Sequence, residues 1–354
     1  MAGSEVLIIG GGLAGWRAAD AAVAGGASVA LVANGAGNSP EIHALNCPVL
    51  PEDSVGLYVE DTLSSGRYGN DRALVETMCR ESVHLKDEFR FDGTLIRPLG
   101  SSVPRCVSIN HAIGAVALAG IKSRLKDVVE VESRTVTAEE LLGIRAEDPR
   151  RKIIIATGGW CGKYAFSTNP AYLKGDGLAM AEALGAAVKD VDEEHVQYEP
   201  TVRVRGPERG VPVITTLLND GAVLIGADRR QIQPAAGLNK DELSRAIFRS
   251  GGYAFYDLSA VPEEKIRACR MDVSDRFIKV APAPHSSLGG IVIDTGCHAL
   301  DSSGRVVPGL FACGEVTAGV HGLNRLGGNG GTAAMVFGAI AGRQAALELK
   351  NERR

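Results

Sequence analysis

The stretch EVLIIGGGLAGWRAADAAVAGGASVALVANG, residues 5–35, decides the fold. Its apolar pattern predicts a buried strand, a tight glycine turn, an alanine-rich helix and a second buried strand, which form one βαβ unit. Gly10, Gly12 and Gly15 fit the G-x-G-x-x-G spacing directly after a strand and before a helix. Gly10 permits the turn, Gly12 lets the backbone approach a pyrophosphate, and Gly15 allows the helix to pack on the strand. A dinucleotide, NAD or FAD, is therefore expected at the helix N-terminus, which carries about half a positive charge.

The end of the second strand departs from the usual pattern of such units. An acidic residue that binds the ribose is usual about 20 positions after the glycine turn, but this chain has Ala33 and Asn34 there. The Asn34 side chain can still form a hydrogen bond with a ribose hydroxyl. We place Asn34 in the cofactor site, together with Leu13 and Ala14 of the glycine turn.

Composition excludes several classes of function. Of the 354 residues, 45% are hydrophobic and 23% are charged, as in an ordinary globular protein. The 38 basic and 42 acidic residues leave no excess of positive charge for nucleic acid. The seven cysteines are scattered and never spaced as Cys-x-x-Cys, which predicts neither a disulfide framework nor a metal site. This use of cysteine fits a reducing compartment, so we expect a cytoplasmic protein. No apolar run reaches the ~18 residues that span a bilayer, so we expect no direct membrane insertion.

The rest of the chain predicts a two-part α/β domain with an insertion. Covering helices are expected over residues 71–90 and 109–126, where apolar residues recur at helical spacing. IIIATGG at 153–159 predicts a strand that ends in a glycine turn. Between 199 and 284 the texture changes to prolines, short strands and a charged helix. We therefore expect a Rossmann-like domain in two parts, 1–198 and 285–354, interrupted by a small α+β capping domain over 199–284.

Several distal motifs together make a specific pattern. They are IIIATGG with the following STNP (167–170) and GDGLAMAEALGA (175–186), HSSLGGI (285–291), GLFACGEV (309–316) and HGLNRLGGN (321–329). With the N-terminal glycine turn, they make the chain resemble the flavoprotein family of succinate dehydrogenase, fumarate reductase and L-aspartate oxidase. The match covers nearly the whole chain. The resemblance implies FAD as the cofactor, bound in a two-part domain that is interrupted by a mobile cap.

The resemblance also implies residues that contact the flavin. Glu315 is expected on the ribityl chain, because a carboxylate accepts hydrogen bonds from hydroxyls. Backbone amides of residues 329–332, at the start of the last helix, are expected to stabilise negative charge on the N1–C2=O edge of the reduced flavin. The expected cofactor residues on these distal motifs are Ala156, Thr157, Gly158, Asp176, Gly314, Glu315, Arg325, Gly328, Asn329, Gly330 and Gly331.

A second expected cofactor loop is SPEIHALNCP, residues 39–48. We expect Ser39, His43 and Asn46 to line the flavin. His43 lies close to where respiratory members of the family attach FAD covalently through histidine. The small-residue and Gln-Gly-Gly pattern that follows in those members is missing here. We therefore expect non-covalent FAD.

For the substrate, the resemblance implies His285 and Arg325. Arginine can hold a carboxylate with two parallel hydrogen bonds, and histidine can add a further donor. Relatives that act on dicarboxylates usually carry His-Pro-Thr where this chain has Glu199-Pro200-Thr201, so carboxylate binding at that end should weaken.

A second departure concerns proton transfer. Relatives use an arginine followed by aspartate as the proton donor or acceptor at substrate carbon, and the best alignment places Lys240-Asp241 there. Lysine is able to do acid–base chemistry but is not equivalent to a fixed guanidinium. Arg245, one helical turn away, is the fallback candidate.

These residues predict an FAD-dependent dehydrogenase or reductase. Hydride would move between flavin N5 and a carbon of a small carboxylate or amino-acid-like substrate, and classical succinate or fumarate turnover is disfavoured. Arg325 and His285 would anchor a carboxylate, Lys240 would transfer the proton, and Glu199 would recognise a cationic or hydroxylated group. The alternative is a flavin-bearing electron-transfer subunit of a larger complex, without its own substrate chemistry and with a partner protein. Nucleic acid is not expected as a partner.

Overall fold

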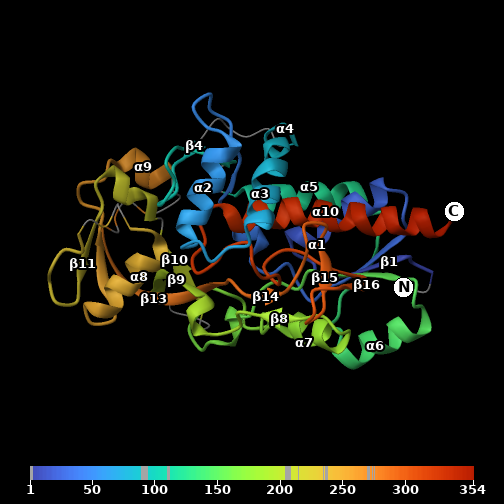
Figure 1. Cartoon of the computed structure of the whole chain (residues 1–354). Helices are drawn as coiled ribbons and strands as arrows, with labels where there is room; N and C mark the ends of the chain where they lie inside the picture. The colour runs from blue at the N-terminus through green and yellow to red at the C-terminus, as the bar shows by residue number, and fades with distance from the viewer. Residues whose placement is uncertain are drawn as a thin grey trace.

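The computed structural model describes residues 3–88, 95–109, 112–203, 209–213, 215–233, 235, 238–268, 272, 274 and 276–354. The central sheet of the fold has the strand order β15-β16-β7-β1-β2-β6 (Figure 1). Its strands are β1 Val6–Ile9, β2 Val29–Val32, β6 Glu130–Glu132, β7 Lys152–Ile155, β15 His298–Leu300 and β16 Val306–Ala312. All neighbouring pairs are parallel except β15 with β16. β1 and β7 are buried along their whole length, as strands covered on both faces must be.

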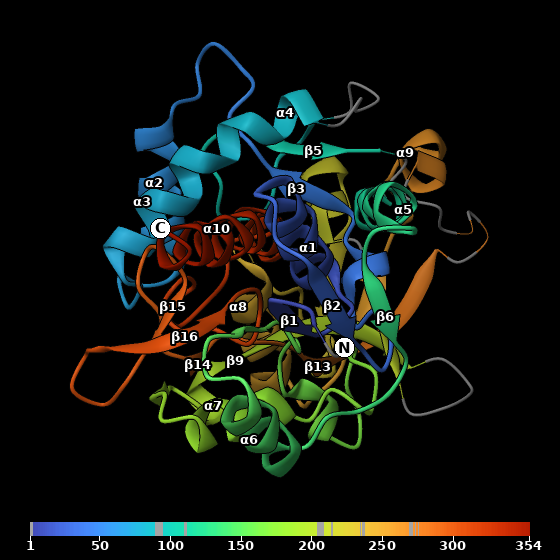
Figure 2. The ribbon, with the colours of Figure 1, turned by 90° about the vertical axis from the view of Figure 1, so that its right-hand side faces the viewer.

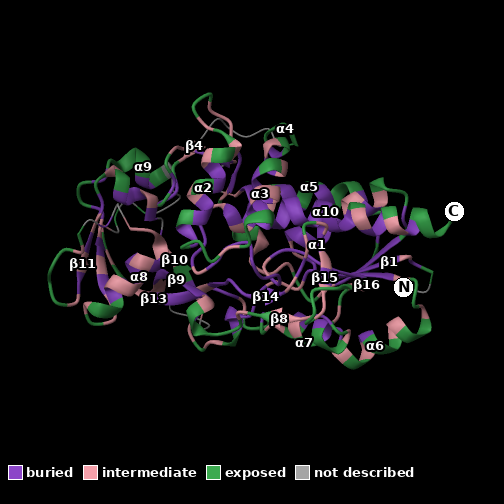
Figure 3. Ribbon diagram, viewed as in Figure 1, coloured by how far each residue is buried: buried purple, intermediate pink, exposed green. Residues whose placement is uncertain are grey.

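Helices cover both faces of this sheet. α1 (Leu13–Ala24), α5 (Ile113–Leu125) and α10 (Asn329–Glu352) lie on one face, and α6 (Ala138–Glu147) and α7 (Asp176–Ala183) lie on the other (Figures 1 and 2). The sheet and the helices on it form a continuous apolar core. Strands and the first half of α10 are buried, while the outer faces of α6 are exposed (Figure 3).

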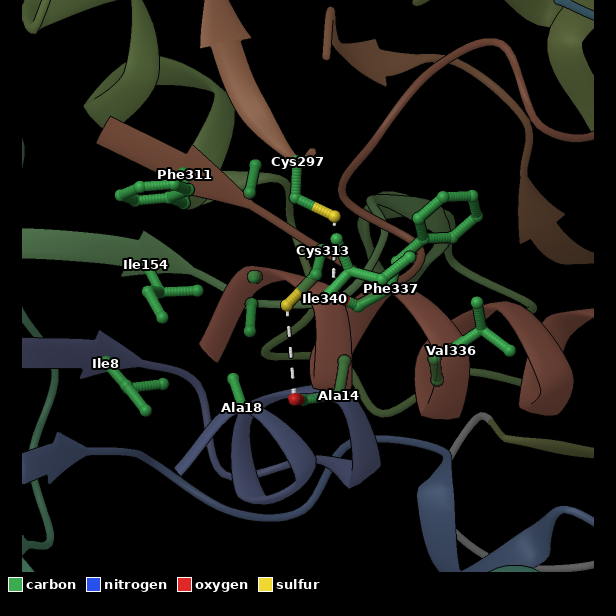
Figure 4. Packing of buried hydrophobic residues seen from close by; sticks show 14 of the residues in the cluster. Ile8, Ala14, Ala18, Ile154, Cys297, Phe311, Cys313, Val336, Phe337 and Ile340 are labelled. Atoms are coloured by element: carbon green, nitrogen blue, oxygen red, sulfur yellow. Dashed lines mark hydrogen bonds between the residues drawn. The ribbon is translucent and has the colours of Figure 1, made fainter. Parts of the chain in front are cut away.

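A close-up of this core shows side chains from three strands meeting α1 and α10. Ile8, Ile154 and Phe311 lie on adjacent strands, to the left of Phe337 and Ile340 of α10 in Figure 4. Two buried thiols contact helix backbone there: Cys297 Sγ lies 3.3 Å from the Phe337 carbonyl oxygen, and Cys313 Sγ lies 3.9 Å from that of Ala14. The cysteines in the described ranges are buried and free.

The contact between α1 and α10 depends on glycine. A Cβ at Gly338 would lie 2.6 Å from the Ala14 carbonyl oxygen, and one at Gly342 would overlap the carbonyl oxygen of Ala18. The two helices are parallel, because later residues of α10 face later residues of α1. Gly338 lies nine residues after the first residue of α10, and Ala14 lies one residue after the first residue of α1. Because these two residues face each other, the N-terminus of α10 projects eight residues, or about 12 Å, past the N-terminus of α1.

Smaller elements lie outside the central sheet. β3 (Ala44–Asn46), β5 (Cys106–Ser108) and β4 (Leu95–Ile96) form an antiparallel sheet. β14 (Gly290–Ile291) pairs with β8 (Val188–Lys189). The helices beside them are α2 Val55–Ser65, α3 Arg72–Glu81 and α4 Leu85–Glu88, and the short 3₁₀ turns are η1 Ser39–Glu41, η2 Ser82–His84, η3 Cys161–Lys163, η4 Glu193–His195 and η5 Thr215–Asp220.

A second, antiparallel sheet forms the cap, at the end of the molecule away from both termini (Figure 1). Its order is β10-β9-β13-β12-β11, and α8 and α9 accompany it. The cap has its own apolar core, centred on Leu224, Leu243 and Tyr256. The bounds are β9 Val196–Arg203, β10 Gly210–Pro212, β11 Val223–Gly226, α8 Lys240–Arg249, β12 Ala254–Asp257, α9 Glu263–Ala268 and β13 Phe277–Ser287.

The expected α/β fold with a cap is confirmed. The expected boundaries at 199 and 284 fall inside β9 and β13, which run from one part into the other. The expected helix over 71–90 begins after an Asp71 cap, but Ser82 breaks it by donating its hydroxyl to the Cys79 carbonyl. Residues 89–90 of that prediction, and 110–111 of the next, lie outside the described residues.

Two other kinds of feature do not occur in the described residues. No helix in this part of the chain is both long enough and apolar enough to span a bilayer. Within the same ranges, no group of His, Cys, Asp and Glu side chains gathers in a way that holds a metal ion.

The α1–α10 contact makes a testable prediction about stability. We expect Gly342→Ala to lower the free energy of unfolding by about 1 to 3 kcal/mol, because its methyl group has no space against α1. Gly143→Ala is the matched control, since this exposed glycine lies within α6 and a Cβ there meets nothing within 4 Å. We expect it to stabilise the protein by roughly 0.5 to 1 kcal/mol. Denaturant unfolding measures both, and equal effects would contradict the tight contact.

Candidate active site

One cavity of about 900 Å³ runs from the glycine turn to the cap. The expected cofactor residues that line it are Gly10, Gly12, Leu13, Ala14, Asn34, Ser39, His43, Ala156, Thr157, Gly158, Asp176, Gly314, Glu315, Arg325, Gly328, Gly330 and Gly331. The expected substrate residues Glu199, Lys240 and His285 line the same cavity. Its volume is in the range of cavities that enclose whole cofactors or drug-sized ligands.

The glycine turn forms one end of the cavity. Gly10 has a φ of +127°, and a Cβ there would overlap the Ala156 carbonyl oxygen of the neighbouring strand. A Cβ at Gly15 would overlap the Gly10 carbonyl oxygen, so Gly15 serves helix–strand packing and does not reach the wall. α1 then begins with Gly12 as its N-cap and no side-chain cap there. The Ser39 hydroxyl accepts from the Leu13 amide at 2.8 Å. The remaining amides of this first turn suit an anion.

A second helix start faces the same cavity. Gly328, with a φ of +88°, precedes α10, whose first turn has neither a side-chain cap nor an acidic residue. The amides of Asn329 and Thr332 are taken by the carbonyls of Leu326 and Gly328. Of the four backbone amides predicted to face the flavin, those of residues 329–332, the described structure therefore leaves two for a ligand, those of Gly330 and Gly331.

Asn46 and Asn329 lie behind the wall, which corrects their predicted position. Both are fully buried, and Asn46 Nδ2 donates to Asn329 Oδ1 at 2.6 Å. The Tyr58 hydroxyl donates to the same oxygen, and Thr332 Oγ1 accepts from the Asn46 amide. Their side chains are used to fix the start of α10 against β3, so they do not line the cavity.

Glu315 sits where β16 ends. Its Oε1 accepts from the Ser287 amide at 3.0 Å and from the Ser287 hydroxyl at 3.1 Å. Burial raises the pKa of this carboxyl. Asn34 lies further out, where its amide nitrogen is 3.4 Å from the Thr135 hydroxyl. Thus Glu315 and Asn34 place polar side chains at two separate positions along the wall.

Four side chains contact one another through Glu199 at the cap end of the cavity, and we call them the Glu199 cluster: Glu199, Lys240, His285 and Arg325. They come from β9, the start of α8, β13 and the loop before α10. Lys240 Nζ donates to both oxygens of Glu199, at 2.9 and 2.8 Å. His285 Nε2 lies 3.2 Å and Arg325 Nη2 3.6 Å from Glu199 Oε1. The structure therefore brings together four of the five side chains expected at the reaction centre.

The electrostatics of the cluster follow from burial and charge. Glu199 is 1% exposed, and burial opposes its ionisation, yet the positive charges around it lower its pKa to about 2. Burial lowers the pKa of His285 to about 4, so the ring is neutral at pH 7. Because Nε2 faces a carboxylate, the ring proton belongs there, and Nδ1 accepts from the Thr168 hydroxyl at 2.8 Å.

Arg245 lies outside the cavity, contrary to the fallback prediction. Arg245 lies five positions after Lys240 on α8, which turns the two side chains about 140° apart. Arg245 Nε donates instead to Asp241 Oδ2 at 2.6 Å, and its side chain is 42% exposed. Asp241 is fully buried beneath it.

Sequence reasoning missed several residues on the wall. Thr168, which positions His285, lies in the STNP motif, and His321 is the first residue of HGLNRLGGN. Both residues therefore belong to motifs that already pointed to the cofactor site. Burial lowers the pKa of His321 to about 3. Thr215 and Arg209 also line the cavity, but no motif marks them. Arg209 links β10 of the cap to Glu41 of η1 through an ion pair of 2.5 Å.

Orphaned polar atoms remain at the cap end. His321 Nδ1, Arg325 Nε and Thr215 Oγ1 have no hydrogen-bond partner among the described residues. These residues are only 7%, 8% and 2% exposed and all line the cavity. Buried polar atoms are nearly always paired, so atoms of this kind in a cavity indicate a ligand.

Comparisons with known proteins agree with this geometry. A family model described as an FAD binding domain matches residues 5–105 and 124–330. L-aspartate oxidase from Caulobacter vibrioides is 31% identical over 397 residues, which cover 97% of this chain and 76% of that protein. One of the subunits of fumarate reductase (CoM/CoB) from Methanothermobacter marburgensis is 30% identical, covering 97% and 72%.

Solved structures share the fold. The open conformation of a flavocytochrome c3 fumarate reductase matches with a TM-score of 0.74 at 25% identity, covering 97% of this chain and 78% of that one. Quinol fumarate reductase FrdA from E. coli matches with a TM-score of 0.83 at 21% identity, covering 99% and 71%.

The residues of the cavity fit FAD. The starts of α1 and α10 have no side-chain cap and suit the pyrophosphate and the flat ring of a long ligand. Glu315 can accept hydrogen bonds from the hydroxyls of such a ligand, and the glycines leave no room for Cβ atoms. The expected family is thereby confirmed: the chain belongs to the FAD-binding flavoproteins that include L-aspartate oxidase and fumarate reductase.

Proposed function

We propose that this FAD-dependent oxidoreductase acts on a small carboxylate-bearing substrate other than succinate or fumarate, in either direction of hydride transfer. The observation that carries the proposal is the convergence of Arg325, Lys240 and His285 at the end of the cavity that the glycine turn opens. A substrate held there lies beside the first turn of α10. The relatives' names, L-aspartate oxidase and fumarate reductase, support a small carboxylate.

The chain's own groups would hold FAD non-covalently along the cavity. The start of α1, from Gly12 to Ala14, would bind the pyrophosphate, and Asn34 would contact the ribose. Glu315 would accept from ribityl hydroxyls, and the amides of Gly330 and Gly331 would face the ring. When bound, FAD supplies hydride transfer at N5.

Arg325 would anchor the substrate carboxylate. Its Nε has no partner among the described residues, and its guanidinium offers the paired donors that a carboxylate matches. Glu199 orients Lys240, because both carboxylate oxygens accept from Nζ. Lys240, 28% exposed and on the cavity wall, would deliver or receive the proton at the substrate carbon next to the one that exchanges hydride.

An electron-transfer subunit without substrate chemistry is the competing function. Such a subunit needs no buried cluster of arginine, lysine, histidine and glutamate at the inner end of its cofactor cavity. The cluster therefore favours an enzyme with its own substrate.

A screen of small molecules tests the proposed function. We expect the photoreduced protein to be reoxidised, or the oxidised protein bleached, by at least one compound in a panel of carboxylic and amino acids, followed by flavin absorbance. No response to any of them, together with fast electron exchange with a partner protein, would contradict an enzyme and favour the electron-transfer subunit.

The role of Lys240 makes a second prediction. Lys240→Met is made in the Glu199→Gln background so that no buried carboxylate loses its partner, and it should lower turnover about 100-fold or more relative to Glu199→Gln alone, because general acid–base catalysis typically contributes that much, with FAD content unchanged. Arg249→Met is the matched control: it removes an exposed cation from the same helix outside the cavity and should leave turnover near that of its parent. Similar losses in both variants would remove Lys240 from proton transfer.

A third prediction concerns Glu315. We expect Glu315→Ala to weaken FAD binding about 10-fold to 100-fold, since hydrogen bonds to charged groups contribute about 1.5 to 3 kcal/mol each. Titration of the apoprotein with FAD, followed by quenching of flavin fluorescence, measures the dissociation constant. Glu263→Ala, a surface carboxylate of the cap, is the control and should bind FAD as wild type does. Unchanged affinity in Glu315→Ala would place this residue away from the cofactor.

A further inference from the structure

The chain's own Lys240, His285 and Arg325 already surround the Glu199 carboxylate. Both of its oxygens accept from Lys240, and Oε1 also lies near His285 and Arg325. The carboxylate is 1% exposed although it forms part of the cavity wall. This geometry replaces the expectation that Glu199 recognises a cationic or hydroxylated group. Glu199 instead occupies the position in which Lys240, His285 and Arg325 would otherwise bind a carboxylate of the substrate.

The charges at this end of the cavity can be counted. Arg325 and Lys240 each carry one positive charge, and Glu199 carries one negative charge. His285 and His321 are neutral at pH 7, because burial lowers both pKa values. Nearby, Arg209 and Glu41 cancel each other in their ion pair, and Glu315 is bound by Ser287 in the cofactor half. The Glu199 cluster with His321 therefore has a net charge of plus one.

A single positive charge with spare donors fits a single carboxylate. Arg325 has its Nε free of hydrogen bonds within the described chain, and His321 Nδ1 and Thr215 Oγ1 are likewise unpaired and buried. A second carboxylate on the same substrate would have to compete with Glu199 for Lys240 and His285. It would also approach Glu199 itself, a like charge in a buried site where such repulsion is only weakly screened.

We infer that Glu199 is a built-in second carboxylate that makes the site specific for monocarboxylate substrates and excludes dicarboxylates. This inference rests on the proposed function, since it refines the class of carboxylate that the site receives. Glu199 is thus a specificity-determining residue, and its pairing with Lys240 sets the charge of the site. Removing its charge should open the site to dicarboxylates.

A matched pair of ligands tests this inference. Crotonate and fumarate share the same four-carbon skeleton with one double bond and differ by one carboxylate. Their dissociation constants for the FAD-loaded protein are measured from the change in flavin absorbance and, independently, by calorimetry. For wild type we expect crotonate to bind at least about tenfold more tightly than fumarate, as like-charge repulsion at a buried site requires.

Variants that change the charge step by step sharpen the test. Glu199→Gln keeps the shape and raises the net charge to plus two, so fumarate should gain about tenfold or more, while crotonate should change by less than about threefold. In Glu199→Gln with Lys240→Met, the net charge returns to plus one and the preference for crotonate should return. Glu263→Gln, which removes the same charge from an exposed site in the cap, should match wild type.

The outcomes distinguish a failure of the inference from a failure of the proposed function. Equal or tighter binding of fumarate by wild type, or no gain of fumarate affinity in Glu199→Gln, would overturn the inference, while FAD-dependent turnover of a small carboxylate would still stand. Failure of crotonate to bind wild type with FAD still bound would also overturn the inference, and the same failure together with no response in the screen of carboxylic and amino acids would overturn the proposed function. The comparison in wild type needs no variant, so the test stands even where Glu199→Gln does not fold.

Discussion

The close contact between α1 and α10 is the constraint on which the site depends. Glycines at 338 and 342 let α10 lie directly on the backbone of α1, and the two helices run parallel. Both N-termini therefore point to the same cavity, but they are offset by about 12 Å along it. One start is suited to a pyrophosphate and the other to a group that gains negative charge on reduction. The backbone positions of the two helix N-termini thus set the orientation of a long cofactor, independently of the side chains that contact it.

The cap completes this arrangement from the opposite side. Glu199 and His285 lie on neighbouring strands, β9 and β13, and Lys240 begins the helix that packs on them. Only Arg325 comes from the nucleotide-binding part. Because the cluster is shared between the two parts, a ligand bound by Arg325 meets groups that belong to the cap. The two departures from the family pattern, at 199 and 240, are also one unit: the two side chains form an ion pair, and a buried Glu199 without Lys240 would be unfavourable.

Sequence predicted the features that local pattern encodes. The glycine turn, the buried strands around it, the cap at Asp71, and the motif residues Glu315 and Arg325 all depend on short segments. Most of the wrong or missing assignments depend on contacts across the chain. Nothing in their own segments indicates that Asn46 binds Asn329 or that Glu199 binds Lys240. The pairing of Arg245 with Asp241 differs, because the i,i+4 spacing of the two residues on α8 is a local signal that the fallback prediction overlooked. Thr215 and Arg209 reach the cavity only because the cap folds over it.

A crystal structure of the FAD-loaded protein is the decisive measurement, because it shows where each end of the cofactor lies. We predict the pyrophosphate at the start of α1 and the flavin ring beside the amides of Gly330 and Gly331, facing a Glu199–Lys240 ion pair. A flavin ring away from α10, or a Glu199 carboxylate separated from Lys240, would contradict this arrangement.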